Sequence, residues 1–232
     1  NYHFFRERFR GKIVLDIGCG AGYGSSLISS YASKTTGLDT SSAAVNYCRN
    51  KYQSESITFN VARVESLPFR DSTFDVICFF EVIEHLRKPD IGLREIHRLL
   101  RGTGIMILST PNADGNPYRF SPIYPFHERE YTMNELRELL LSNGFIINEI
   151  YGKRVKGDKD SDESMRGNLP LKLRLLGLVM RSRLVRTMVR LLPQKVRSLI
   201  GGQTRQVPES DVIIRSGDIN ADDRIFLCTK KD

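Results

Sequence analysis

The sequence lacks any run of about 18 uncharged apolar residues, the length that a membrane-spanning helix needs. It also lacks any Cys-x-x-Cys pair, because its four cysteines lie far apart, at Cys19, Cys48, Cys78 and Cys228. Cys19 lies among glycines, and the other three lie in apolar or helical contexts typical of small buried residues. With 232 residues and 40% hydrophobic content, we expect a soluble, cytoplasmic protein with one sizeable core.

Acidic residues are absent from residues 171–200, which contain eight lysines and arginines. Without these eight, the 35 basic residues would equal the 27 acidic ones in number, so the net charge of +8 belongs to this segment. Its apolar and basic residues recur at near-helical spacing, which predicts one or two amphipathic helices over residues 169–200, interrupted at Pro193. Three roles remain open: a helical lid, contact with a membrane surface or lipid-linked substrate, and a clamp for another polyanion. Nucleic acid is disfavoured, since no aromatic residues are interleaved here.

Residues 12–110 alternate short β-branched runs with amphipathic stretches, the pattern of an α/β fold with a parallel sheet. The expected helices are 25–32, one capped by Ser41 or Ser42, and 132–141. The expected strands are 13–15, 35–38, 57–59, 74–80, 105–108, 145–150 and 224–229. We expect one core domain formed by residues 1–155 and 211–232. Residues 156–210 then form an insertion, a charged linker followed by the basic helices.

The most informative stretch runs from Val14 to Gly24 and reads VLDIGCGAGYG. Its glycines let the backbone turn sharply and approach a ligand at the carboxyl end of the first strand. A dinucleotide site would need a glycine at position 23, which is tyrosine, and no Gly-Lys-Ser/Thr follows for a triphosphate. Asp39, at the end of the second strand, can accept hydrogen bonds from both hydroxyls of a ribose, and its alternative role is a helix cap. Together the glycine loop and Asp39 favour a ligand site.

Five segments resemble those of the class I S-adenosylmethionine-dependent methyltransferases: VLDIGCGAGYG, TTGLDTS, SLPFRDSTFDVI, EVIEHL and LREIHRLLRGTGIMILSTPN. The resemblance covers about residues 2–151 and 224–230. It implies a Rossmann-like, doubly wound sheet of seven strands, mainly parallel, whose last strand is antiparallel. The chain is most similar to the group associated with bacterial polysaccharide assembly, through its GYGS, FEVIEH and PFHEREYT segments.

The same resemblance implies how S-adenosylmethionine is bound. The glycine loop would lie near the methionine part, Asp39 would hold the ribose, and Val64 and its neighbours would flank the adenine. The implied cofactor-binding residues are Asp16, Gly18, Cys19, Gly20, Gly22, Asp39, Thr40, Val64, Glu65 and Phe80. Arg63 departs from the pattern, because relatives often carry Asp there. The adenine amino group would then lose a side-chain acceptor.

Acidic and histidine residues follow the fourth strand, at the edge where the methyl acceptor should lie. Glu81, Glu84 and His85 have the spacing of one helical face, and His127 lies near the end of a long loop from Pro111 to Tyr131. His85, Glu84 and His127 are candidate catalytic residues that remove a proton from an acceptor hydroxyl or amine. Alternatively, Glu81, Glu84, His85 and His127 hold a divalent ion such as Mg²⁺. In a purely structural role, the two acids would favour the helix dipole and His85 would only pack.

The expected function is therefore methyl transfer from S-adenosylmethionine to an oxygen or nitrogen atom of a small-molecule or glycan-type acceptor. A lipid-linked acceptor is one form of this hypothesis. Two alternatives stay open. The first is a catalytically inactive cofactor-binding protein that docks to membranes through residues 169–200. The second is a metal-dependent RNA 2′-O-methyltransferase, because the Glu-x-x-Glu-His and His-x-x-Glu-Tyr-Thr patterns also resemble those enzymes, while the first pattern resembles ubiquinone O-methyltransferases.

Overall fold

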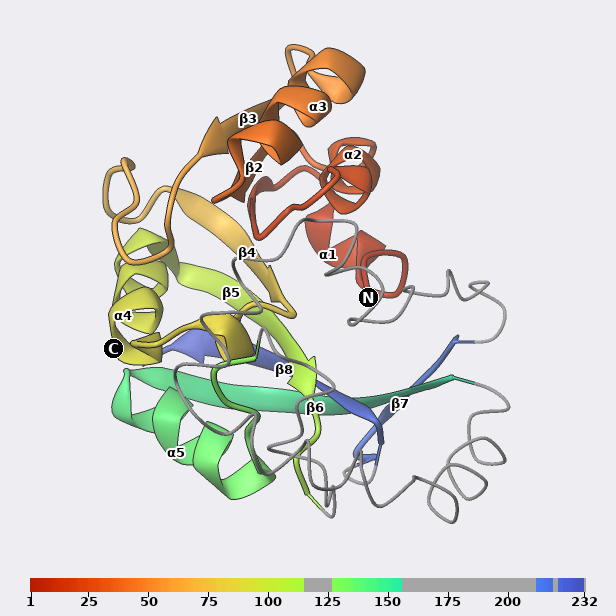
Figure 1. Cartoon of the computed structure of the whole chain (residues 1–232). Coiled ribbons are helices and arrows are strands. Elements are labelled where there is room, and N and C mark those ends of the chain that lie inside the picture. Colours follow the sequence, from red (N-terminus) through yellow and green to blue (C-terminus); the bar gives the residue numbers. More distant parts are fainter. Residues whose placement is uncertain (115–126, 156–211, 219–220, 232) are drawn as a thin grey trace, which may run out of the picture.

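The chain folds around one eight-stranded sheet in the computed structural model, which describes residues 1–114, 127–155, 212–218 and 221–231 (Figure 1). The strand order is β3-β2-β1-β4-β5-β8-β6-β7. The order reverses between β1 and β4, so the carboxyl ends of these two strands border a crevice suited to ligands. Among the described residues, no helix is both long and apolar enough to cross a bilayer.

The first five strands are parallel, and helices separate them in the chain except between β3 and β4. Their bounds are β1 Ile13–Ile17, β2 Lys34–Asp39, β3 Ile57–Val61, β4 Phe74–Phe80 and β5 Leu100–Pro111. The helices of this half are α1 Arg6–Phe9, α2 Tyr23–Ser29, α3 Ser42–Tyr52, the 3₁₀ turn η1 Ile83–His85 and α4 Pro89–Leu99. The Ser41 side chain caps α3 by accepting a hydrogen bond from the Ala44 amide, as the sequence predicts.

The remaining strands form an antiparallel half, after α5 Met133–Ser142. The closing strand β8 Asp223–Lys230 lies between β5 and β6 Phe145–Val155, antiparallel to both. The sequence predicts seven strands, whereas the sheet has an eighth, β7 Val212–Ser216, paired with β6 at the edge. This short strand was missed because only its pairing with a distant segment defines it.

Successive side chains of each strand point to opposite faces of the sheet, so each face has its own hydrophobic core. In β4, Ile77 and Phe79 pack with leucines and isoleucines of α4 and α5, whereas Val76 and Cys78 pack with Phe5, Phe9 and Ile28. This period of two is expected of strands that are covered on both faces. Figure 1 shows the resulting layers, with α1 and α2 on one side of the sheet and α4 and α5 on the other.

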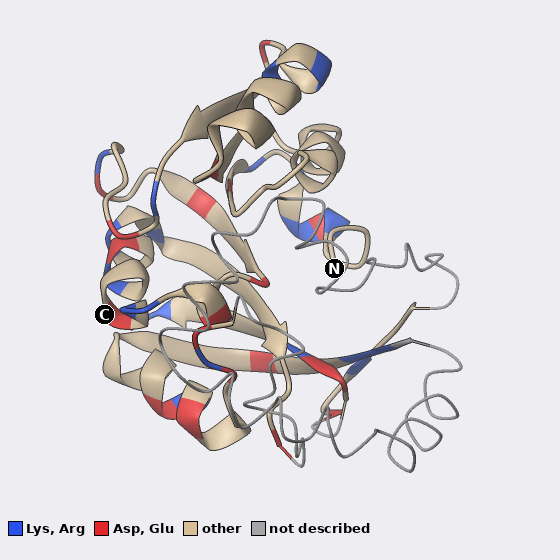
Figure 2. Cartoon of the chain, viewed as in Figure 1, with Lys and Arg blue, Asp and Glu red and all other residues tan. Residues whose placement is uncertain are grey.

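Each predicted strand lies within, or coincides with, an observed one. The predicted helix 25–32 begins earlier, at Tyr23, and ends at Ser29. Thr132 is the N-cap of α5 rather than its first residue, and it forms a reciprocal capping box with Glu135. The predicted insertion at 156–210, with its basic helices, lies outside the described residues. Within them, Lys and Arg residues occur on α1, on and beside α4, and where β6 and β7 pair (Figure 2).

Candidate functional site

The glycine loop follows β1 and is tied to the neighbouring strand. The amides of Gly18 and Cys19 both donate to the Leu38 carbonyl at 2.8 Å. Gly18 has φ +77°, and a β-carbon there would come within 2.4 Å of the Val82 side chain, so only glycine fits. A β-carbon at Gly20 would meet no atom within 4 Å. The backbone at Gly20 therefore borders open space, as a loop that contacts a ligand requires.

Asp39 is hydrogen-bonded to this loop. Its carboxylate accepts hydrogen bonds from the Gly20 amide at 2.9 Å and from the Ser41 amide at 2.8 Å. Each carboxylate oxygen keeps a further lone pair for an external donor. Asp39 thus joins the glycine loop to the start of α3, and its side chain is only partly buried.

Asp16 supports the loop from beneath. Its carboxylate is fully buried and accepts hydrogen bonds from Ser25 Oγ at 2.5 Å and Tyr2 Oη at 3.0 Å. Burial raises the pKa of Asp16 to about 6, which the two hydrogen bonds oppose. Tyr2 also packs edge-on against Phe80, with ring centroids 4.9 Å apart. Sequence reasoning missed Tyr2, because nothing in its local context links it to a loop 14 residues away.

The remaining predicted cofactor residues differ in exposure. Cys19, Val64 and Phe80 are buried, Glu65 is partly buried and Thr40 is exposed. The Arg63 side chain is 73% exposed, and its guanidinium pairs with Glu65 at 3.2 Å. Arg63 therefore does not restore the acceptor that an aspartate would offer to an adenine amino group.

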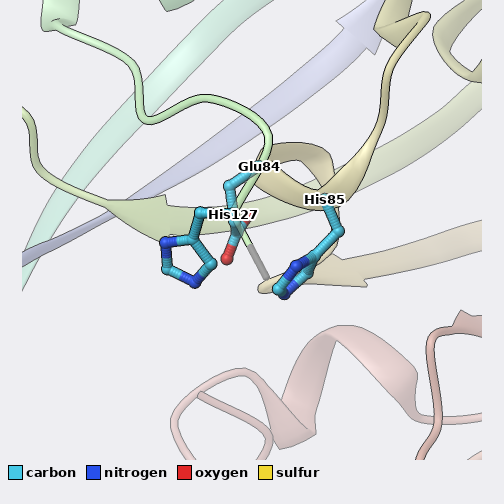
Figure 3. A group of neighbouring side chains, drawn as sticks. All are labelled: Glu84, His85 and His127. Carbon is cyan, nitrogen blue, oxygen red and sulfur yellow. The ribbon is translucent and has the colours of Figure 1, made fainter. Parts of the chain in front are cut away.

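A compact group of three side chains lies at the carboxyl end of β4. Glu84 and His85 come from η1, and His127 comes from the loop before α5 (Figure 3). One ligand atom from each lies within 4.8 Å of the others, and the two imidazole rings have centroids 4.9 Å apart. The loop is held here because the amides of Glu128 and Arg129 both donate to the Glu84 carbonyl. His127, distant in sequence, is thus brought to the adjacent pair Glu84 and His85, as expected.

Glu81 lies apart from this group, which corrects the prediction of a shared helical face. Its φ of +54° precedes the 3₁₀ turn, so it does not belong to a helix. Its carboxylate accepts a hydrogen bond from Ser109 Oγ at 2.5 Å. Such a left-handed conformation is costly for a residue with a side chain, and Glu81 does not belong to the group of ligand atoms that lie within 4.8 Å of one another.

The carboxyl groups of Glu81 and Glu84 are both held in a setting that favours the protonated form. Burial, with Asp223 and Glu84 nearby, raises the pKa of Glu81, while Lys153 and Ser109 oppose the shift. Burial also raises the pKa of Glu84 to about 7. Glu84 is 1% exposed; Thr110 Oγ1 donates to its Oε2, but Oε1 has no hydrogen-bond partner among the described residues. A buried oxygen without a partner indicates a place for a donor or a cation.

The raised pKa of Glu84 predicts a pH-dependent change in stability. The folded state binds this proton more tightly than the unfolded chain, in which the carboxyl titrates near 4.5, so ionisation between pH 4.5 and 7 destabilises the fold. Glu84→Gln cannot ionise. We therefore expect its unfolding free energy to gain about 2 kcal/mol relative to wild type when the pH is raised from 5 to 8. Urea unfolding at both pH values measures this change.

Glu95→Gln is the matched control. Glu95 lies on α4, and its hydrogen bond to Arg98 lowers its pKa, so the difference from wild type should not grow between pH 5 and 8. An equal difference for Glu84→Gln at the two pH values would contradict the assignment of a protonated, buried Glu84.

Comparison with known proteins finds sequences similar to that of this chain. Residues 15–108 match the family model described as a methyltransferase domain. A Mycobacterium tuberculosis protein named a probable S-adenosylmethionine-dependent methyltransferase is 38% identical over 146 residues, which are 62% of this chain and 53% of that protein. A ubiquinone biosynthesis O-methyltransferase of Coxiella burnetii is 29% identical over 129 residues, 55% of this chain and 53% of that one. The chain thus spans about half the length of these curated relatives.

The fold itself also matches solved structures. The YcgJ protein of Bacillus subtilis superposes with a TM-score of 0.64 at 20% sequence identity, covering 100% of this chain and 98% of that one. The glycine loop and Asp39 lie within the matched domain, as do Glu84 and His85, whereas His127 lies beyond it.

Proposed function

We propose that this chain, whose residues 15–108 match a methyltransferase-domain model and whose Rossmann-like fold matches solved structures, binds S-adenosylmethionine and transfers its methyl group to an oxygen or nitrogen atom of a small-molecule or glycan-type acceptor. The observation that carries the proposal is the pairing of the glycine loop with Asp39. The Gly20 amide donates to the Asp39 carboxylate at 2.9 Å, and a β-carbon at Gly20 would meet no atom within 4 Å.

The glycine loop, Asp39 and the residues around them fit this cofactor. Asp39 accepts hydrogen bonds from the ribose hydroxyls, and the Gly18–Gly22 backbone lies against the methionine part. Tyr2 and Phe80 close the buried end near Asp16. When bound, S-adenosylmethionine supplies a strongly electrophilic methyl group. Much of the rate then comes from the chain holding the acceptor in line, which alone contributes several kcal/mol.

The acceptor side is formed by Glu84, His85 and His127. His85 is exposed and beside the buried Glu84, so it can take the proton of an acceptor hydroxyl as the new bond forms. Oxygen is the preferred acceptor atom, because a hydroxyl gains most from such a proton acceptor. The relative named for O-methyl transfer in ubiquinone biosynthesis supports the same choice.

A glycan-type acceptor is supported by the resemblance of the GYGS, FEVIEH and PFHEREYT segments to methyltransferases of bacterial polysaccharide assembly. If the acceptor is lipid-linked, residues 169–200 would meet the membrane surface through their basic and apolar residues. That segment lies outside the described residues, so this part of the proposal depends on its sequence alone.

A divalent cation such as Mg²⁺ would also fit the acceptor side. Glu84 Oε1, without a partner among the described residues, is an oxygen ligand, and the two imidazoles complete a set of three. Glu81 does not join this group. An ion bound there would polarise the acceptor oxygen. The donor set, two histidines and one carboxylate, is also one that suits transition metals.

Radioactive methyl transfer tests the proposal. The chain is incubated with S-adenosyl-[methyl-³H]methionine and, separately, neutral glycosides, the same glycosides on a polyprenyl lipid, and a small RNA, each with and without EDTA. We expect label in a glycoside or its lipid-linked form. Label in the RNA alone would overturn the glycan part, and no label with any hydroxyl- or amine-bearing acceptor would overturn the activity. Loss of transfer with EDTA, restored by Mg²⁺, would support the bound cation.

A further inference from the structure

Glu130 is a buried acid that has no role in the reaction proposed above. Its side chain lies next to the acceptor side, with Oε1 3.0 Å from His127 Nδ1. Glu130 is 3% exposed, and its Oε2 has no hydrogen-bond partner among the described residues. Burial of a carboxyl oxygen without a hydrogen-bond partner destabilises the fold, so such a residue requires an explanation.

The segment that carries His127 and Glu130 is fixed at both ends. Before Glu130, the amides of Glu128 and Arg129 are held by the Glu84 carbonyl. After it, Tyr131 bridges to Asn112, and the Thr132–Glu135 capping box begins α5. The backbone therefore sets the distance between the carboxyl and the ring, instead of leaving it to a flexible loop.

The neighbouring acids of this segment behave differently. Glu128 pairs with Arg87, whose side chain is 71% exposed, and Glu135 pairs with Arg129 near the surface. Both thereby lie in ordinary surface ion pairs, which contribute little to stability. The Glu130 carboxyl is instead directed to the His127 imidazole, with no Lys or Arg partner in the described part of the chain.

A carboxylate can only accept hydrogen bonds, so the imidazole nitrogen facing it carries the hydrogen. In a neutral ring the other nitrogen then keeps its lone pair. For His127 this means Nδ1–H directed to Glu130 and an unprotonated Nε2 on the other side of a ring that is grouped with Glu84 and His85, one ligand atom of each residue lying within 4.8 Å of the others. Carboxylate–histidine pairs of this kind fix both the ring orientation and the tautomer.

We propose that Glu130 is a positioning residue that holds His127 as its Nδ1–H tautomer, so that Nε2 presents a lone pair to the methyl acceptor. The inference rests on the proposed function for the identity of the acceptor site. The tautomer itself is a property of the chain and is independent of methyl transfer.

Nuclear magnetic resonance of the full chain, labelled with ¹⁵N-histidine and saturated with S-adenosylhomocysteine, tests this proposal. Two-bond ¹⁵N–¹H correlations at pH 8 report the tautomer of each ring, and His127→Gln assigns the His127 signals. We expect Nδ1–H in the wild type. Glu130→Gln keeps an acceptor oxygen and should retain this tautomer. Glu130→Leu removes the acceptor and should shift the ring to the Nε2–H form that a free neutral imidazole favours.

Glu128→Gln is the matched control, because it alters an acid two residues away that pairs with Arg87, and it should leave the tautomer unchanged. An Nε2–H tautomer of His127 in the wild type would overturn the proposal without any variant. So would a folded Glu130→Leu chain that retains Nδ1–H. Separate calorimetry with S-adenosylhomocysteine shows whether the proposed function has failed instead, since that binding does not depend on Glu130.

Discussion

Replacing Asp39 by alanine is expected to weaken S-adenosylhomocysteine binding by at least about 100-fold. The Asp39 carboxylate already holds the Gly20 and Ser41 amides and would also accept the ribose hydroxyls. Hydrogen bonds to a charged group contribute about 1.5–3 kcal/mol each, so the loss of two exceeds 3 kcal/mol, or about two orders of magnitude in Kd. Asp39→Asn retains one acceptor oxygen and should lie between the two. Calorimetric titration measures all three proteins.

Asp71→Ala provides the control for Asp39→Ala. Asp71 is 73% exposed and lies in the loop that leads into β4, at the opposite edge of the sheet, where it pairs with Arg98. Its replacement should leave the affinity within about twofold of the wild type. If Asp39→Ala binds as tightly as Asp71→Ala, then Asp39 serves only to cap α3 and the ribose contact is wrong.

The second large effect is expected for His85→Ala, which should lower kcat by about 100-fold or more and leave S-adenosylhomocysteine affinity within about twofold. A positioned general base contributes about 10²–10⁴ to the rate. His85 is exposed and belongs to η1, whereas the glycine loop follows β1, so the variant removes the imidazole without altering a residue of that loop. Initial rates with the acceptor found by radioactive transfer, together with calorimetry, separate these two effects.

His97→Gln is the corresponding control. His97 lies on α4, where its ring packs against Phe145 with centroids 5.5 Å apart, away from Glu84 and His127. Its replacement should leave kcat within about threefold of the wild type. A His85→Ala chain with wild-type kcat would show that in-line positioning supplies the rate and that the base is not needed.

The cofactor side could be predicted from the sequence because its signals are local. The glycines at 18, 20 and 22 indicate a sharp turn by residue type alone, and Asp39 follows a β-branched strand directly. Their meeting in space follows from parallel pairing, since the carboxyl ends of β1 and β2 lie at one edge of the sheet. The positions of these residues in the sequence were therefore enough to predict that they lie close together.

The acceptor side could be predicted only in part. The proximity of His127 to His85 was expected from the motif, but the conformation of Glu81 was not, because a helical spacing does not reveal a left-handed residue before the turn. Glu130 had no assigned role, although its spacing of three from His127 is a signal for a histidine–carboxylate pair. Tyr2 and β7 depend on contacts over 14 and more than 50 residues, which no local pattern encodes.

Calorimetric titration of the wild-type chain with S-adenosylhomocysteine and, in parallel, with NAD⁺ tests the central claim most directly. The open glycine loop and Asp39, with tyrosine in place of a dinucleotide glycine at position 23, predict one S-adenosylhomocysteine bound per chain at micromolar concentration and no NAD⁺ binding. No heat of binding for S-adenosylhomocysteine at high micromolar ligand, or tighter binding of NAD⁺, would contradict the account.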